Sequence, residues 1–226
     1  MANKIVEDPR IDPRIKDLFK DMPQMAGARV ESRDHLLSAM QAMAGQSSIG
    51  SLFESLDLEG IAPSAGLTIA KHELVSAPDG NTISVNLIRP EGSEVLPCVY
   101  YIHGGGMMMM SAYDANYAAW GRLIAGQGVA VAMVEFRNSA VPNTLGEVAP
   151  YPGGLNDCLS GLRWVLDNAA SLGIDPARVI VAGESGGGNL TLATGLALNR
   201  AGEANRIKGL YALCPYIKGE WSDEDG

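Results

Sequence analysis

Apolar side chains in the first 60 residues recur at three- and four-residue steps, the spacing of one helix face. The two sets are Ile11, Ile15, Leu18, Phe19 and Met22, and Leu36, Leu37, Met40 and Met43. Pro13 lies near the start of the first set, and Gly27 and Gly45 follow the two sets, as expected at helix boundaries. The pattern predicts a helical N-terminal segment over residues 1–60.

From about residue 67, short apolar runs alternate with helical patterns. We expect strands over 67–75, 82–89, 98–103, 129–136, 178–182 and 207–214. We expect helices over 113–127, 155–172 and 189–200. Continuous apolar strands separated by amphipathic helices are typical of a parallel sheet covered on both faces. The first two strands are joined by a Ser-Ala-Pro-Asp-Gly-Asn turn, so a hairpin leads into a six-stranded sheet of the α/β class.

Length and composition fit one α/β domain with a small appendage. The chain has 226 residues, 46% of them hydrophobic, which fits a soluble globular protein. No apolar run reaches the about 18 residues of a membrane span, and the charged N-terminus lacks a secretory signal. We therefore expect a cytoplasmic location. The net charge of −9, with scattered basic residues, argues against a nucleic-acid partner.

The three cysteines, Cys98, Cys158 and Cys214, lie in apolar stretches and form no CxxC pair. Buried free thiols are therefore the more ordinary interpretation, ahead of a disulfide or a metal site. We expect neither a cofactor nor a metal.

The sequence Gly183-Glu184-Ser185-Gly186-Gly187 matches GxSxG between a predicted strand and a predicted helix. A serine on such a turn projects its hydroxyl above the carboxyl edge of the sheet, where a substrate can reach it. The alternatives are a plain turn or a phosphate-binding loop, but a phosphate loop needs a lysine that is absent here. We predict that Ser185 is the catalytic nucleophile.

A second glycine motif, His103-Gly104-Gly105-Gly106, directly follows another predicted strand. Backbone N–H groups aimed at a developing oxyanion contribute about 3 kcal/mol each. Glycines let that backbone approach the substrate closely. We predict an oxyanion hole formed by Gly104, Gly105 and Gly186.

The HGGG and GESGGGNL motifs together resemble the hormone-sensitive-lipase-like family of α/β-hydrolases, the bacterial family IV carboxylesterases with a helical cap. The segments 151–158, 162–165 and 173–178 are similar to the family's approach to the nucleophile. The resemblance covers about residues 67–219, and it implies that the N-terminal helices begin the cap. One departure is Phe136-Arg-Asn-Ser-Ala-Val141, where the family usually has Tyr-Arg-Leu-Ala-Pro-Glu; Gly186 also replaces a more usual alanine.

A serine nucleophile needs a histidine base oriented by a carboxylate, and in this fold both follow the serine. The chain has no histidine after Ser185; its three histidines are His35, His72 and His103. We interpret the first two as structural or solvated, and the resemblance implies that His103 shapes the oxyanion loop. For Glu184 a structural role is expected, and for Asp157 support of a helix start with a pairing to Arg137.

Ser185 follows the fifth of the eight strands expected for this fold, and only one further strand is predicted after it. We therefore expect the chain to be part of a longer polypeptide. We expect a cap segment over 1–60, the hydrolase core with its first six strands over 61–219, and the start of a second cap segment or a loop over 220–226. The triad acid and histidine are then expected beyond residue 226, and the 226 residues alone are expected to be inactive.

The run Met107-Met-Met-Met110 follows the glycines. Flexible methionines suit an adaptable apolar wall, so Met107 and Met108 either line a substrate pocket or fill the core. We predict a carboxylesterase acting on small esters of short to medium acyl chains, with a homodimer as one candidate assembly. Two alternatives stay open: a receptor-like binding protein that lacks the base, and an inactive truncated product.

Overall fold

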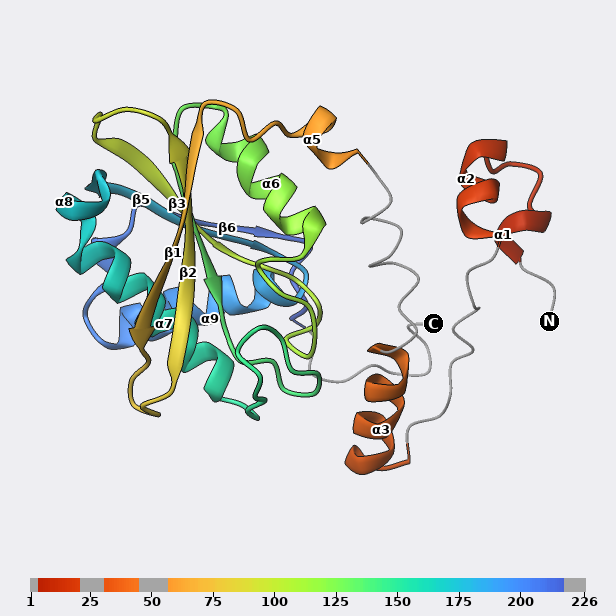
Figure 1. The fold of residues 1–226 in the computed structure, drawn as a ribbon. Helices are drawn as coiled ribbons and strands as arrows, with labels where there is room; N and C mark the ends of the chain where they lie inside the picture. Colours follow the sequence, from red (N-terminus) through yellow and green to blue (C-terminus); the bar gives the residue numbers. More distant parts are fainter. Residues whose placement is uncertain (1–3, 21–30, 45–56, 218–226) are drawn as a thin grey trace. The chain divides into compact units, whose positions relative to one another are not determined.

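A computed structural model describes residues 4–20, 31–44 and 57–217, in two compact units, Met1–Ser55 and Leu56–Gly226. The described helices of the first unit are α1 (Lys4–Glu7), α2 (Pro13–Phe19) and α3 (Arg33–Ala44) (Figure 1). The α2 helix begins at Pro13, after Asp12 caps it by accepting the Arg14 amide. The predicted boundary residues Gly27 and Gly45, and Met22, lie outside the described residues.

A six-stranded sheet forms the second unit, in the order β1-β2-β4-β3-β5-β6. Its strands are β1 (Leu67–Val75), β2 (Thr82–Pro90), β3 (Leu96–Ile102), β4 (Ala130–Glu135), β5 (Ile174–Glu184) and β6 (Gly209–Leu213). The β1–β2 and β2–β4 pairs are antiparallel, whereas β3–β4, β3–β5 and β5–β6 are parallel. The predicted hairpin and the mostly parallel sheet of an α/β-hydrolase fold are confirmed.

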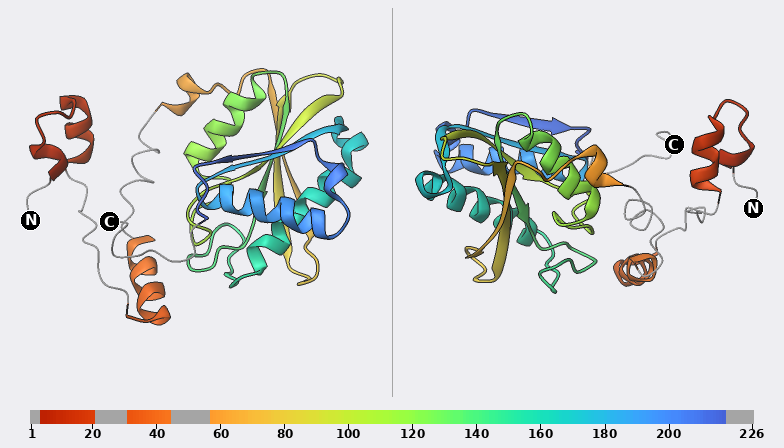
Figure 2. Two further views of the ribbon diagram at one scale, coloured as in Figure 1. Left: turned by 180° about the vertical axis from the view of Figure 1, so that it is seen from behind. Right: turned by 45° about the horizontal axis from the view of Figure 1, so that its top comes forward.

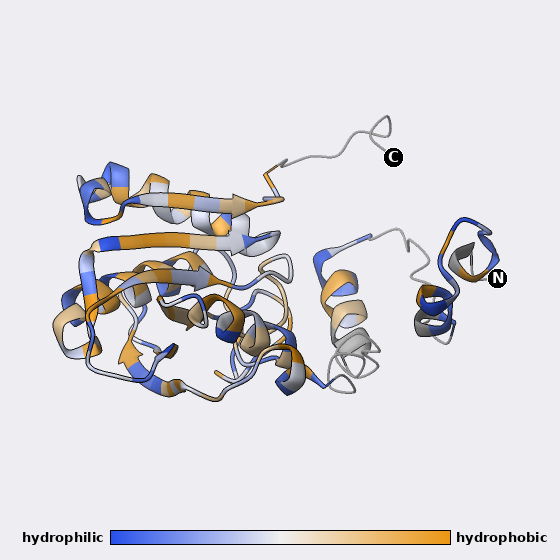
Figure 3. Ribbon diagram, turned by 90° about the horizontal axis from the view of Figure 1, so that it is seen from above, coloured by the Kyte–Doolittle hydropathy of each residue, from blue (hydrophilic) through white to orange (hydrophobic). Residues whose placement is uncertain are grey.

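Helices cover both faces of this sheet (Figure 2). One face carries α6 (Ala115–Ala125), with α5 (Leu58–Ile61) packed beside it. The other face carries α7 (Gly153–Asp167), α8 (Ala169–Leu172) and α9 (Gly186–Arg200). All six residues of β4 are buried, because this central strand is covered on both sides. Figure 3 shows the apolar colouring running along the strands.

Three details differ from the sequence prediction. The helix expected over 155–172 is interrupted at Asn168, whose φ of −104° and ψ of 10° separate α7 from α8. Strand β5 begins at Ile174, before the predicted start at 178. Its pairing with β3 shifts register between Leu96 and Cys98 of β3. Cys98 and Cys158 are buried free thiols, but Cys214 is exposed, because it leaves the edge strand β6 in a turn with a φ of 37°.

The helices in the described ranges include none with the length and apolar character that a membrane crossing requires. Those ranges also hold no cluster of three or more histidine, cysteine or carboxylate side chains suited to a metal ion. The cytoplasmic location, the possible homodimer, and the cap and loop roles of 1–60 and 220–226 stay predictions.

Candidate active site

Ser185 lies at the junction between the end of β5 and the start of α9. Its φ of 54° and ψ of −118° fall in a backbone region that residues other than glycine rarely adopt. The hydroxyl caps no amide of α9, and the residue is partly exposed. The main chain is held on both sides: Ser185 N donates to Leu213 O at 2.9 Å, and Tyr216 N donates to Ser185 O at 3.2 Å.

Glycines flank this turn because the backbone of β3 lies against it. A Cβ on Gly187 would lie 2.1 Å from Ile102 O, and one on Gly183 would lie 2.5 Å from Gly187 O. Neither position can hold a side chain without moving main-chain atoms. The GxSxG pattern is therefore a steric requirement of this elbow.

The glycine loop after β3 brings its backbone against Gly186. A Cβ on Gly186 would lie 2.7 Å from Gly106 N and 2.6 Å from Met107 N. Gly105 and Gly106 have φ values of 91° and 63°, which glycine adopts without strain. Within the described part of the chain, the amides of Gly105 and Gly106 donate to no protein group, which leaves them available to a ligand.

The Gly104 amide, in contrast, is occupied. Gly104 N donates to Tyr117 Oη at 3.0 Å, and that hydroxyl donates to Glu184 Oε1 at 2.5 Å. The Gly104 amide is therefore engaged within the protein, whereas, among the described residues, the amides of Gly105 and Gly106 are not. Tyr117 is a site residue that the sequence prediction missed, because it lies on α6 and belongs to no motif.

His103 is fully buried and supports the loop. Its ring stacks on Phe136 with centroids 4.3 Å apart, and Nδ1 lies 3.0 Å from Gly104 O. Because a carbonyl oxygen can only accept, Nδ1 carries the proton and donates it. Burial lowers the pKa of His103 to about 4, so the ring is neutral at pH 7.

We expect this buried histidine to make the fold sensitive to acid. The folded-state pKa of about 4 lies below the ordinary value of about 6.5, so the unfolded chain binds the proton first. The contribution of His103 is fully present above pH 6.5 and is lost as the pH falls toward 4. At pH 5 the loss amounts to about 2 kcal/mol of unfolding free energy.

The measurement is urea unfolding at pH 7.5 and pH 5 for the natural protein and for His103→Gln, which does not titrate. The natural protein should lose about 2 kcal/mol more than the variant between these two pH values. Equal losses in both proteins would contradict the assignment.

Of the other two histidines, only His72 lies in the unit that contains the Ser185 elbow. His72 is on β1, separated from β5 by three strands in the sheet, and its ring contacts Trp164 with centroids 5.3 Å apart. His35 is exposed on α3 in the first unit, where Nδ1 accepts the Glu31 amide at 3.4 Å. Residues 57–217 therefore contain no histidine placed as a base for Ser185.

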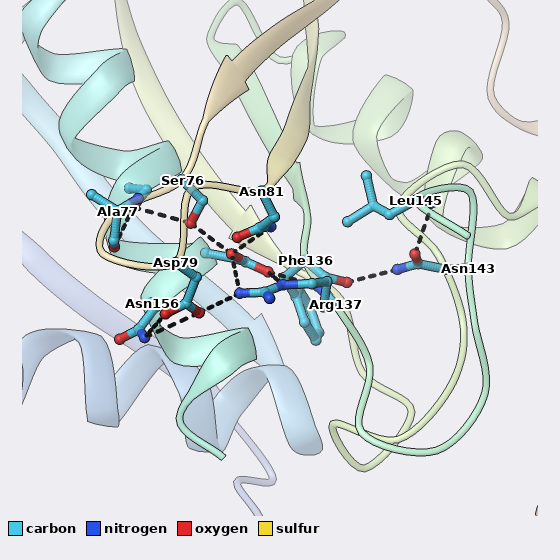
Figure 4. Close-up of polar contacts among 11 residues, drawn as sticks. Ser76, Ala77, Asp79, Asn81, Phe136, Arg137, Asn143, Leu145 and Asn156 are labelled. Atoms are coloured by element: carbon cyan, nitrogen blue, oxygen red, sulfur yellow. Dashed lines mark hydrogen bonds and ion pairs between the residues drawn. The ribbon is translucent and has the colours of Figure 1, made fainter. Parts of the chain in front are cut away.

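The loop after β4 is fixed by a buried ion pair between Arg137 and Asp157, a pairing that the sequence prediction included. The expected support of a helix start is wrong, because α7 begins at Gly153 and Asp157 lies one turn further on. Arg137 Nε lies 2.8 Å from Asp157 Oδ2, and Arg137 Nη2 lies 2.5 Å from Asp79 Oδ2. Figure 4 shows the guanidinium among the polar groups of the hairpin turn, where Ser76 Oγ also donates to Asp157 Oδ1 at 2.6 Å. The pair thus ties β4, α7 and the β1–β2 turn together.

The segment 138–141, where the sequence departs from the family pattern, forms hydrogen bonds with the methionine run. Ser139 N donates to Met107 O at 3.0 Å, and Val141 N donates to Met108 O at 2.8 Å. Asn138 Nδ2 also donates to Met110 O at 2.8 Å. The unusual segment therefore holds the methionine loop in place.

A cavity of about 480 Å³ opens beside the glycine loop. Its lining includes Gly106 and Met107 from that loop, and Asn189 from the first turn of α9, which also begins at the elbow. Most of the lining is apolar, and it also includes Met108, Tyr151, Leu155, Leu190 and Tyr216. Met107 and Met108 thus line a cavity bordered by both motif segments.

A serine on a strand-to-helix elbow, facing a glycine loop with free amides, places this molecule in the class of α/β hydrolases. A family model described as the alpha/beta hydrolase fold matches residues 99–225. The chain belongs to that family, and within it to the hormone-sensitive-lipase-like esterases that the sequence motifs resemble.

The solved structure of esterase Est22 is similar to this chain, with 57% identity and a TM-score of 0.89 over 99% of this chain and 66% of that one. Brefeldin A esterase, described as a bacterial homologue of human hormone sensitive lipase, shows 33% identity and a TM-score of 0.79, covering 97% of this chain and 61% of that one.

Carboxylesterase NlhH of Mycobacterium tuberculosis is 40% identical over 96 residues, which are 42% of this chain and 28% of that protein. The chain therefore spans less than two thirds of the length of each of these relatives.

Proposed function

We propose that the natural polypeptide containing this chain hydrolyses carboxylic esters through an acyl-enzyme on Ser185. The observation that carries the proposal is the strained elbow at Ser185, with the free amides of Gly105 and Gly106 beside Gly186. The named relatives are esterases, which supports the same activity here.

In the proposed reaction, Ser185 Oγ adds to the ester carbonyl carbon while its proton passes to a histidine base. The carbonyl π electrons move onto oxygen, and that oxyanion accepts hydrogen bonds from the amides of Gly105, Gly106 and Gly186. The intermediate collapses, the C–O bond to the alcohol breaks, and the alcohol leaves with the proton. Water then cleaves the acyl-enzyme by the same route, releasing the carboxylic acid and restoring Ser185.

The histidine and its orienting carboxylate are proposed to come from residues beyond 226. This part of the proposal is supported by the absence of a suitable histidine within 57–217 and by the order serine, acid, histidine in this fold. It follows that the 226 residues alone should turn over esters far more slowly than the natural polypeptide.

The direct test is labelling with a fluorophosphonate probe, followed by peptide mass spectrometry. An esterase should carry the phosphonyl group on Ser185, because phosphonylation uses the same nucleophile, base and oxyanion hole. A receptor-like protein without the base should be labelled slowly or not at all. Absence of labelling in the natural polypeptide would therefore contradict the proposed hydrolysis.

We further propose that the cavity beside Met107 and Met108 binds the acyl chain of short to medium esters. Replacing Met108 with tryptophan should fill part of it, so kcat/KM for p-nitrophenyl octanoate should fall about 10-fold or more relative to p-nitrophenyl acetate. Met109→Trp is the matched control, because Met109 is in the same loop but does not line the cavity. An unchanged octanoate-to-acetate ratio in Met108→Trp would place the acyl chain elsewhere.

A further inference from the structure

One phenol hydroxyl connects the two segments of the site. Tyr117 Oη accepts the Gly104 amide at 3.0 Å and donates to Glu184 Oε1 at 2.5 Å. Tyr117 is on α6, and its side chain is buried, with the residue only 6% exposed. The contact is tight, since a Cβ on Gly104 would lie 2.1 Å from Glu184 Oε1.

This connection acts directly next to the reacting groups. Glu184 precedes Ser185, and Gly104 precedes the free amide of Gly105. His103 Nδ1 holds Gly104 O at 3.0 Å, and in a planar trans peptide the following N–H points the opposite way. With its N–H held by Tyr117 and its C=O held by His103, Gly104 fixes the direction in which the Gly105 amide points.

We propose that Tyr117 and Glu184 are positioning residues that hold the oxyanion loop in register with the nucleophile elbow. This inference rests on the proposed ester hydrolysis at Ser185. Neither side chain touches the reacting atoms in this scheme; they act through the Gly104 and Ser185 backbones.

The chemistry of the hydroxyl suits this task. Burial raises the pKa of Tyr117, and its hydrogen bond to Glu184 raises it further. The phenol therefore stays protonated over the working pH range of an esterase and keeps its donor for Glu184. Its oxygen remains free to accept the Gly104 amide, so both hydrogen bonds exist together.

The test compares Tyr117→Phe with Tyr113→Phe in the natural polypeptide, using a p-nitrophenyl ester. Tyr117→Phe keeps the ring but removes both hydrogen bonds, so kcat should fall about 10- to 100-fold while KM stays within about twofold. Tyr113 is the matched control because its hydroxyl contacts Ser84 Oγ at 2.9 Å, on β2. Its phenylalanine variant should keep the natural kcat.

A trifluoromethyl ketone gives a readout that a purely structural role would not move. It adds reversibly to the serine and places an oxyanion in the hole, so its Ki should weaken in Tyr117→Phe by the same factor as kcat. An unchanged Ki, or a loss that appears in KM and not in kcat, would overturn the proposal.

Glu184 provides an independent pair of variants if Tyr117→Phe folds poorly. Glu184→Gln keeps an acceptor oxygen for the phenol and should stay within about threefold of the natural kcat, whereas Glu184→Ala should lose about 10- to 100-fold. Natural activity in Glu184→Ala would overturn the positioning role. If instead the unmodified protein is not labelled by fluorophosphonate, it is the proposed hydrolysis that fails.

Discussion

Replacing Ser185 with alanine in the natural polypeptide is expected to lower kcat/KM for a p-nitrophenyl ester on the order of 10⁴- to 10⁶-fold. The reason is that no other hydroxyl stands on the elbow between β5 and α9. Alanine keeps the Cβ of serine, so the strain at a φ of 54° is unchanged and the melting temperature should move little. The measurements are steady-state kinetics and thermal unfolding of the same preparation.

Ser171→Ala is the control for this experiment. Ser171 is exposed on α8, before the start of β5, and its hydroxyl donates to Asn168 O at 2.9 Å. It lies at the opposite end of β5 from the elbow, so its removal should leave kcat/KM within about twofold. Retained turnover in Ser185→Ala would rule out the nucleophile assignment, whatever the control shows.

Replacing Asp157 with alanine is expected to reduce the unfolding free energy by about 3–5 kcal/mol. The carboxylate is fully buried and accepts from Arg137 N, Nε and Nη2, and from Ser76 Oγ and Asn81 Nδ2. Its loss leaves the buried guanidinium with Asp79 as its remaining carboxylate partner (Figure 4). Urea unfolding at pH 7 measures the change.

Asp175→Ala is the matched comparison, because it breaks a more exposed ion pair of similar length, 2.7 Å against 2.8 Å. Arg178 Nε lies 2.7 Å from Asp175 Oδ2, and the arginine side chain is 54% exposed. Water replaces such a pair at little cost, so the variant should lose less than about 1 kcal/mol. Equal losses in the two variants would show that burial does not decide the strength of the Arg137 pair.

The sequence predicts most of this fold because the physical signals are local. Residues 130–134 of β4 are continuously apolar, and the two glycine motifs follow strands directly. The pairing of Arg137 with Asp157 could also be anticipated, since Arg137 follows β4 closely and Asp157 lies in the next helix. Periodicity, by contrast, could not show where a helix stops, so the break at Asn168 was missed.

The parts that could not be predicted depend on contacts between distant segments. Tyr117 gains its importance from Gly104 and Glu184, which are 13 and 67 residues away along the chain. Our proposal of Gly106 in place of Gly104 as an amide donor rests on the same contact. The exposure of Cys214 depends on the position of β6 in the sheet, which an apolar run alone does not reveal.

The hydrogen bonds on the main chain of Ser185 have a consequence for how the site is assembled. Its N–H and its C=O are bonded to Leu213 and Tyr216, which are synthesised after the elbow itself. A nascent chain that has released β5 but not β6 from the ribosome lacks these two partners and keeps only the Asn189 amide, which donates to Ser185 O at 3.0 Å. Docking of the sixth strand therefore completes the hydrogen bonding of the Ser185 main chain.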